Sequence, residues 1–455
     1  MAPRLIESLA TTEELAELFS DESVLQAMLD FEVALARTEA GLGILPQAAA
    51  ERIAAVAKAN LFDAAAMSHD TLRAGTPGIA LVKALTERVR ASDPAAAGFV
   101  HWGATSQDVT DTALVILLKR AQSIFERDLA RLEKALRSLS GEHANTVMLG
   151  RTLMQAAPPI TFGLKVAGWL GSIHRSHHRL NASFSDALIV QFGGASGTLA
   201  SLGDQGFVIG QALAHELGLV YPDAPWHTHR DRLAAMLCAC AVLTGSLGKM
   251  ARDISLLMQS EIGEVSESQE HGRGGSSTMP HKHNPIGCSL TLAAANRIPG
   301  LVAIFLSGMT QEHERGTGGW QAEWPTVAAL IQSTGLAIAS MAEVAEGLSV
   351  NSAKMRANIE AMHGTIFAEK AMMVLATKLG LDTAHRLLEQ ATRKSIAENR
   401  RFSEVLAEIP EIAAHLDVET MRSLEDPEKY LGVADEFRKR LLSIPKPRGS
   451  KSERK

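Results

Sequence analysis

The segment DRLAAMLCACAVLTGSLGKMARDISLLMQSEIG, residues 231–263, decides the fold expected for this chain. Its apolar side chains recur at alternating steps of three and four residues, the heptad spacing of a helix that packs against other helices. The eight positions of this seam are Leu233, Met236, Cys240, Leu243, Leu247, Met250, Ile254 and Leu257. A seam this long must be buried against equally long neighbours, and Gly245 and Gly248 allow close helix approach at mid-length. We therefore expect a bundle of long helices, in which Cys238 and Cys240 serve packing.

Composition extends this expectation to an all-α fold. Aromatic residues make up 4% of the 455 residues, whereas helix-forming Ala, Leu, Glu, Arg, Lys and Met are abundant. We predict long helices over residues 112–142, 158–188, 198–217, 229–262, 285–309 and 322–348. The predicted domains are an N-terminal helical domain (1–111), a central long-helix bundle domain (112–355), a C-terminal helical domain (356–442) and a disordered basic tail (443–455).

Charge and targeting features exclude several classes of protein. The formal net charge is −6 and Lys and Arg are spread along the chain, which argues against a nucleic-acid partner. Three cysteines without a CxxC pair argue against a disulfide framework. The N-terminus has acidic residues where a signal peptide is apolar, and no stretch approaches 18 uncharged apolar residues. We expect a cytoplasmic protein with no membrane partner.

The most informative segment for chemistry is GRGGSSTMPHKHNP, residues 272–285. Its glycines allow the backbone to approach a ligand closely. Two hydroxyls, a cation and an amide follow within a few residues, at Ser276, Ser277, Lys282 and Asn284. This composition suits a loop that holds an anion, and an ordinary polar loop is the alternative.

The stretch GSSTMPHKHNP resembles the GSSxMPxKxNP signature of the fumarase/aspartase superfamily. The resemblance implies that Ser276 is the catalytic acid/base toward carbon, that Lys282 assists it, and that Ser277 and Asn284 contact substrate. A serine resists ionisation, so the site must stabilise an alkoxide with N–H dipoles and the lysine cation. The resemblance also implies a fold with a central long-helix bundle flanked by two smaller helical domains. It further implies a homotetramer whose active sites are shared between subunits.

Two more regions match the superfamily in order and spacing. HWGATSQDVTDTA, residues 101–113, resembles its first region, which implies substrate contacts by Thr105, Ser106 and Gln107. GRTLMQAAPPITFG, residues 150–163, resembles its second region, which implies contacts by Arg151 and Thr152.

Two departures narrow the assignment within the superfamily. Many members place a histidine after the Arg-Thr pair and a glutamate seven residues beyond the signature lysine, where this chain has Leu153 and Ser289. FVHWGATSQD (99–108), QFGGASGTLASLG (191–203), PWHTHRDRL (225–233) and QEHERGTGGWQAEW (311–324) resemble the bacterial 3-carboxy-cis,cis-muconate cycloisomerases. Some cycloisomerases carry a histidine at the position of Ala156, so this segment does not identify an acid.

The cycloisomerase resemblance implies that a substrate carboxylate adds across a double bond of the same molecule to close a lactone, with protonation beside another carboxylate. Such a reaction requires cations and N–H donors and implies no cofactor and no metal. Lys282, Arg315 and Arg230 are the candidate cations. His229 and His227 lie beside Arg230, where either a substrate contact or a capping role is open.

Several alternatives remain open from the sequence. A lyase or epimerase acting on a fumarate-derived amino-dicarboxylate uses the same proton abstraction. A sulfomuconate cycloisomerase is a narrower variant, and a structural protein that kept the fold is a non-enzyme alternative. His174, His177 and His178 have metal-ligand spacing, but arginines alternate with them, so we expect a solvated helix face there.

Overall fold

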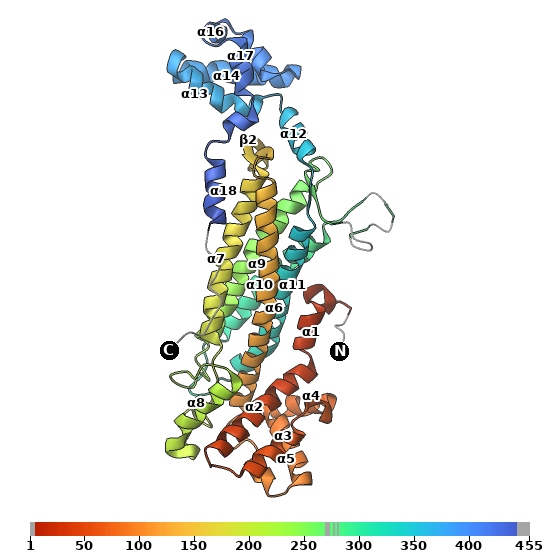
Figure 1. Cartoon of the computed structure of the whole chain (residues 1–455), viewed down its shortest axis with the longest axis vertical. Coiled ribbons are helices and arrows are strands. Elements are labelled where there is room, and N and C mark those ends of the chain that lie inside the picture. The colour runs from red at the N-terminus through yellow and green to blue at the C-terminus, as the bar shows by residue number, and fades with distance from the viewer. Residues whose placement is uncertain (1–4, 269–273, 276–277, 280–281, 444–455) are drawn as a thin grey trace. The chain divides into compact units, whose positions relative to one another are not determined.

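The computed structural model describes residues 5–268, 274–275, 278–279 and 282–443, and it is helical through most of them (Figure 1). The all-α prediction is confirmed. The sheets in these residues are two short antiparallel pairs, β1 (Val147–Thr152) with β2 (Gln155–Thr161) and β3 (Val265–Ser266) with β4 (Ser349–Val350).

Five helices of the described chain have more than 21 residues each. They are α6 (Ser106–Glu142), α7 (Phe162–Ala187), α9 (Asp231–Leu257), α10 (Ile286–Ser307) and α11 (Gly319–Glu346). The predicted helix over 158–188 begins late, because residues 158–161 belong to β2 and the two prolines there lack the N–H that a helix interior requires. The predicted helix over 198–217 is also shorter. A 3₁₀ segment, η4 (Ala200–Gln205), precedes α8 (Gly206–Leu217), because Gly203 adopts a φ of 51°.

Shorter helices occupy both ends of the chain. Before α6 lie η1 (Glu7–Ala10), α1 (Glu13–Leu18), α2 (Asp21–Gly41), α3 (Gln47–Val56), η2 (Ala59–Leu61), α4 (Ala64–Ala74), α5 (Pro77–Ser92) and η3 (Ala96–Phe99). After β4 lie α12 (Ser352–Glu360), η5 (Thr365–Phe367), α13 (Ala368–Leu379), α14 (Leu381–Glu398), α15 (Phe402–Ala407), α16 (Pro410–Ala413), α17 (Val418–Leu424), η6 (Pro427–Tyr430) and α18 (Ala434–Leu442).

The chain forms two compact units, each assembled from separated segments. The first comprises Met1–Ala130, Arg175–Gly248 and Ser289–Met341, and the second comprises Arg131–His174, Lys249–Cys288 and Ala342–Lys455. Each unit contains part of every long helix. The division into three domains and a tail stays a prediction, and residues 444–455 of the predicted tail lie outside the described residues.

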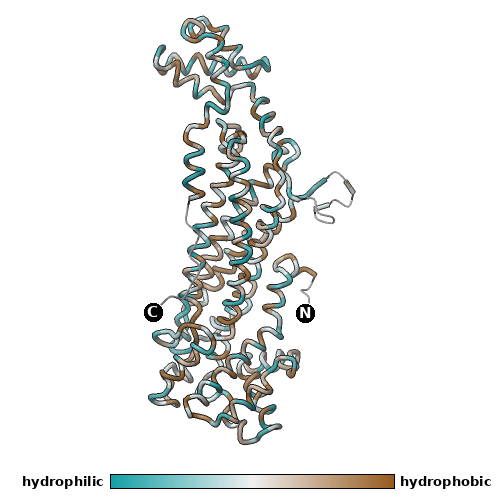
Figure 2. Tube along the Cα trace, in the orientation of Figure 1, coloured by the Kyte–Doolittle hydropathy of each residue, from teal (hydrophilic) through white to brown (hydrophobic). Residues whose placement is uncertain are grey.

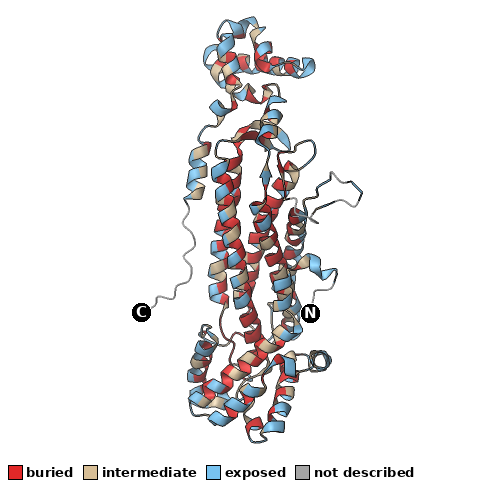
Figure 3. Ribbon diagram, turned by 45° about the vertical axis from the view of Figure 1, so that its right-hand side comes forward, coloured by how far each residue is buried: buried red, intermediate tan, exposed pale blue. Residues whose placement is uncertain are grey.

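The predicted heptad seam of α9 is confirmed. All eight seam side chains are buried, with at most 3% of their surface exposed. Apolar and polar residues alternate along the long helices, and buried positions line their inner faces (Figures 2 and 3). The seam therefore forms core, and Cys240 in it is fully buried.

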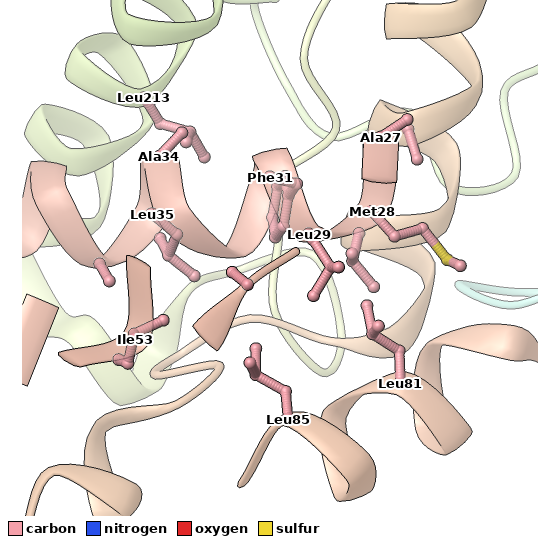
Figure 4. Packing of buried hydrophobic residues seen from close by; sticks show 14 of the residues in the cluster. Ala27, Met28, Leu29, Phe31, Ala34, Leu35, Ile53, Leu81, Leu85 and Leu213 are labelled. Carbon is pink, nitrogen blue, oxygen red and sulfur yellow. The ribbon is translucent and has the colours of Figure 1, made fainter. Parts of the chain in front are cut away.

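The first unit has a core around α2. Phe31 and Leu35 of α2 pack with Ile53 of α3, Leu85 of α5 and Leu213 of α8 (Figure 4). These side chains are at most 2% exposed. Burial of this apolar surface stabilises the packing of the helices that precede residues 101–113, the segment that resembles the first region of the superfamily.

The expectation that no segment has the composition of a membrane span is wrong. Among the described residues, α9, α10 and α11 are long and apolar enough to cross a membrane, by length and composition only. Folding buries 72% of the apolar window of α11 but only 28% of that of α10. Most of the apolar window of α10 is thus not fully buried within one chain.

One carboxyl group lies inside the core of the first unit. Glu39 of α2 has no exposed surface, and neither carboxyl oxygen has a hydrogen-bond partner among the described residues. Burial, and then the nearby charge of Glu32, raises the pKa of Glu39 to about 8.

This pKa makes stability depend on pH. Between about pH 4.5 and pH 8 the unfolded chain has released the Glu39 proton while the folded chain keeps it, so stability falls as pH rises. Glu39→Gln removes this loss, and we expect it to unfold like wild type near pH 4 but to be more stable by on the order of a few kcal/mol at pH 8. Urea unfolding at both pH values measures this. Glu51→Gln, at an exposed position of α3, is the control. If the free energy of unfolding changed equally between pH 4 and pH 8 in wild type and Glu39→Gln, the raised pKa of Glu39 would be contradicted.

Candidate active site

The predicted site residues belong to both units. Thr105, Ser106, Gln107, His229, Arg230 and Arg315 lie in the first unit, and Arg151, Thr152, Lys282 and Asn284 lie in the second. Ser276 and Ser277 lie outside the described residues.

The carboxylate of Asp108 holds three loops of the first unit together. Asp108 is the third residue of α6, and it accepts the backbone N–H of Thr105 at 3.1 Å, as in a capping box. It also accepts the N–H groups of Gly193 at 3.0 Å and Gly194 at 2.9 Å. His227 Nε2 lies 2.7 Å from Asp108 Oδ1, so this nitrogen carries the proton that the carboxylate accepts. Asp108 has no exposed surface, so all four contacts form away from water.

Gln107 and Arg315, both predicted to contact substrate, meet beside this carboxylate. Arg315 Nη1 donates to Gln107 Oε1 at 2.9 Å, and its Nη2 donates to the carbonyl oxygens of residues 194 and 195 at 2.7 and 3.2 Å. Gln107 Nε2 donates to Asp111 Oδ2 at 3.0 Å and to the His227 carbonyl at 2.8 Å. Burial lowers the pKa of Arg315, although the negative charges of Asp108 and Asp111 act to raise it. A partly buried cation is thus fixed next to the start of α6.

Arg230 is held by protein carboxylates. Its guanidinium donates to Asp111 at 2.8 and 3.1 Å and to Glu323 at 2.5 to 3.1 Å, and it lies over the Trp226 ring. Burial alone would raise the pKa of Asp111, but Arg230 and a hydrogen bond from Trp320 hold that pKa below its usual value. Burial raises the pKa of Glu323, which shares the same arginine. Because Arg230 is 1% exposed, contact with a substrate would require displacement of this network.

The other first-unit residues lie nearer the surface. Thr105 and Ser106 are partly exposed at the start of α6, and His229 is exposed before α9. His101 adopts a φ of 59°, and its Nδ1 lies 2.6 Å from Glu32 Oε1. Burial would lower the pKa of His101, but the charge of Glu32 raises it overall. Because Thr105 and Ser106 are partly exposed, their two hydroxyls are available to a ligand at the N-terminus of α6.

In the second unit, Arg151 near the end of β1 forms a paired contact with Glu264. Arg151 Nη1 and Nη2 donate to the two carboxylate oxygens at 3.0 and 2.7 Å. Asn358 Nδ2 also donates to Glu264 at 2.8 Å. Glu264 has no exposed surface, whereas a quarter of the Arg151 side chain is exposed. The pair thus holds the start of residues 150–163, the segment that resembles the second region of the superfamily.

Leu153 and Met154 form the two-residue tip of the β1–β2 hairpin. Both have positive φ, 49° and 67°, which fits the turn favoured by two-residue hairpins. Leu153 is 97% exposed and Met154 is 70% exposed. Thr152, predicted to contact substrate, is exposed beside them. The tip therefore presents a hydroxyl and two apolar side chains.

The described part of the signature loop has its own anchors. Glu267, which is buried, accepts the N–H groups of Gly287 and Cys288 at 3.0 and 2.9 Å at the start of α10. The Asn284 N–H donates to the Gly274 carbonyl at 2.9 Å. Lys282 is exposed, so its ammonium is available to an anion.

The carboxylates that hold these regions are not among the residues predicted from the sequence. Asp108 and Asp111 lie three residues apart at the start of a helix, which puts them on one face. Each has its own donors, since Asp108 accepts loop N–H groups and His227 while Asp111 accepts Arg230. Nothing in the local sequence pairs Glu264 with Arg151, because 113 residues separate them.

The solvated-face prediction for the three histidines is wrong for two of them. His174 and His177 are 5% and 4% exposed and lie 3.4 and 2.9 Å from Glu133 and Glu126, respectively. His178 is exposed. No group of three or more His, Cys, Asp or Glu side chains within the described ranges is placed to hold a metal ion.

The Asp108 contacts predict a cost for neutralising this residue. Asp108→Asn keeps the shape but replaces one acceptor oxygen with a donor, so about two hydrogen bonds are lost. We expect the free energy of unfolding to fall by about 2–4 kcal/mol, measured in urea. Asp204→Asn, exposed in η4, is the control and should change stability by less than about 0.5 kcal/mol. An equal effect of both substitutions would contradict the role of Asp108.

Known proteins are similar to this chain along most of its length. Residues 7–300 match the family model described as Lyase, and residues 364–441 match that described as Adenylosuccinate lyase C-terminus. A 3-carboxy-cis,cis-muconate cycloisomerase of Bradyrhizobium diazoefficiens is 47% identical over 93% of this chain and 94% of its own. A nitrosuccinate lyase of Streptomyces davaonensis is 39% identical over 94% of this chain and 91% of its own.

A solved structure is similar over almost the whole chain. It is the 3-carboxy-cis,cis-muconate lactonizing enzyme from Pseudomonas putida, with a TM-score of 0.91 and 43% identity, and the match covers 97% of this chain and 98% of that one. The fold expected from the resemblance is therefore confirmed. The chain belongs to the lyase family of the fumarase/aspartase superfamily.

Proposed function

We propose that this protein is a 3-carboxy-cis,cis-muconate cycloisomerase. A carboxylate of the triacid adds to a double bond of the same molecule, the carbon beside another carboxylate takes a proton, and a carboxymuconolactone forms. The observation that carries this proposal is the similarity along nearly the full length, at 47% identity, to a relative with that name.

The proposed reaction needs a proton donor, cations and hydrogen-bond donors, and the site residues supply each of these. Negative charge develops on a carboxylate as the double bond is attacked, so cations and N–H or O–H donors must face it. We propose Ser276 as the proton donor and Lys282 as the cation that assists it. The proposed substrate contacts are Thr105, Ser106, Gln107, Arg151, Thr152, His229, Ser277, Asn284 and Arg315, with Arg230 as a further cation of the site.

The hairpin tip supports lactonisation over addition of an external nucleophile. The nucleophile in this reaction is a carboxylate that is already ionised at neutral pH and tethered to the double bond. It needs no histidine–glutamate pair to activate it. Leu153 and Ser289 occupy the positions where many members of the superfamily carry that pair, and both are exposed in the described chain.

The test compares wild type with Ser276→Ala. Wild type should consume 3-carboxy-cis,cis-muconate, seen as loss of the ultraviolet absorbance of the conjugated diene. Ser276→Ala should lower kcat at least about a hundredfold and leave substrate binding within a few-fold, because an acid/base acts on the chemical step.

A fumarate-forming lyase is the second candidate, because a 39% identical relative is named a nitrosuccinate lyase. Fumarate hydration and fumarate amination are therefore assayed in parallel, and we expect neither. Efficient turnover of fumarate without lactone formation would reject the proposed function. Near-normal kcat in folded Ser276→Ala would reject the assignment of the serine.

We also propose that the protein is a homotetramer with shared active sites. The support is α10, whose apolar window is mostly not fully buried within one chain, with Ile304 49% and Leu306 44% exposed. A long apolar helix face of this kind is stable in water when copies of the chain cover it.

Light scattering tests the assembly. Wild type should have four times the chain mass, and Ile304→Glu should give smaller species because it places a charge in the interface. Ile396→Glu changes an isoleucine of α14 that is 69% exposed, and it should leave the mass unchanged. An active wild-type monomer would contradict the proposal.

A further inference from the structure

Lys165 is a partly buried cation that the proposed function does not use. It is the fourth residue of α7, in the second unit, and follows the hairpin that carries Arg151. Within the described ranges, its ammonium has neither an ion pair nor a hydrogen bond. The charged groups that act on it are Asp253, Lys249, Arg151 and Glu264. Trp169, one turn further along the same helix, donates its ring N–H to Asp253.

Both neighbouring carboxylates are already engaged. Glu264 accepts both guanidinium nitrogens of Arg151 and the amide of Asn358. Asp253 Oδ2 accepts Lys249 Nζ at 2.5 Å and Trp169 Nε1 at 2.8 Å. Each of these two carboxylates therefore already has a cation of its own, and Lys165 is the third cation of the cluster.

The charges of this cluster do not balance. Three cations, Lys165, Lys249 and Arg151, accompany two carboxylates, Asp253 and Glu264, which gives these five described residues an excess of one positive charge. Burial lowers the pKa of Lys165, and the two other cations add to this effect. A partly desolvated ammonium of this kind is stabilised by an anion.

We infer that Lys165 binds a carboxylate group of the ligand, beside the Arg151–Thr152 region. This inference rests on the proposed function, in which the substrate is a tricarboxylate and needs a third counter-charge. Arg151 already has Glu264 as its counter-charge, so among the described residues of this cluster Lys165 is the cation whose charge is not balanced. It acts as a substrate-binding residue that favours three carboxylates over two.

Binding of unreactive acids tests the inference without turnover. Calorimetry compares propane-1,2,3-tricarboxylate with pentanedioate, which lacks the middle carboxylate. Wild type should prefer the tricarboxylate by about tenfold or more, the typical effect of one charge-assisted contact. Lys165→Met should lose this preference and Lys165→Arg should keep most of it. Lys134→Met, at an exposed position of α6 in the same unit, should behave as wild type.

Thermal unfolding without ligand separates ligand binding from a structural role. If the ammonium has no protein partner, Lys165→Met should melt at or above the wild-type temperature, because it removes an unpaired, partly buried charge. A clear decrease would show that a protein carboxylate is its partner and would overturn the inference. So would an unchanged tricarboxylate preference in Lys165→Met, or the absence of that preference in wild type.

The two proposals fail in different ways. Wild type that prefers the tricarboxylate but does not form lactone rejects the proposed function and leaves the carboxylate site in place. Wild type that forms lactone while Lys165→Met retains both its preference and its KM rejects the site alone.

Discussion

The first unit depends on one buried carboxylate. Asp108 caps α6 and accepts two backbone N–H groups of the 193–194 turn together with the ring N–H of His227. A carboxylate without access to water is stable only when donors surround it, so the three loops must keep these positions to supply the hydrogen bonds that Asp108 accepts. Because α6 starts at this point, the same contacts place Thr105 and Ser106.

A second set of buried charges also holds the loops around the start of α6. Arg230 shares its guanidinium between Asp111 and Glu323, and Arg315 connects the side chain of Gln107 to the turn that Asp108 holds. Each ion in such a network depends on the others, since loss of one partner leaves a charge buried and unpaired. The network favours a single arrangement of the loops, and it leaves Arg315 partly accessible while Arg230 is enclosed.

In the second unit the carboxylates hold the β1–β2 hairpin and the base of the signature loop, and they leave two lysines unpaired in the described chain. Glu264 and Asp253 each accept hydrogen bonds from a cation and from one further N–H donor, and Glu267 caps the helix that follows the signature loop. These contacts hold the hairpin and the base of the loop, and they leave Lys165 and Lys282 without a carboxylate partner of their own in the described chain. Positive charge that the protein does not neutralise is what a polycarboxylate ligand requires.

The sequence by itself determined the helical fold, the α9 core and the family, because heptad periodicity and a contiguous signature are local properties of the chain. It also indicated the residue types of the site, since Ser276, Lys282 and Asn284 stand within a few residues of one another. Only the tertiary structure decided which charges are free. The partners of Arg151 and Arg230 lie about a hundred residues away in sequence, and no local pattern records a pairing that forms when distant helices pack. The exposed hairpin tip at Leu153 and the unpaired ammonium of Lys165 emerged for the same reason.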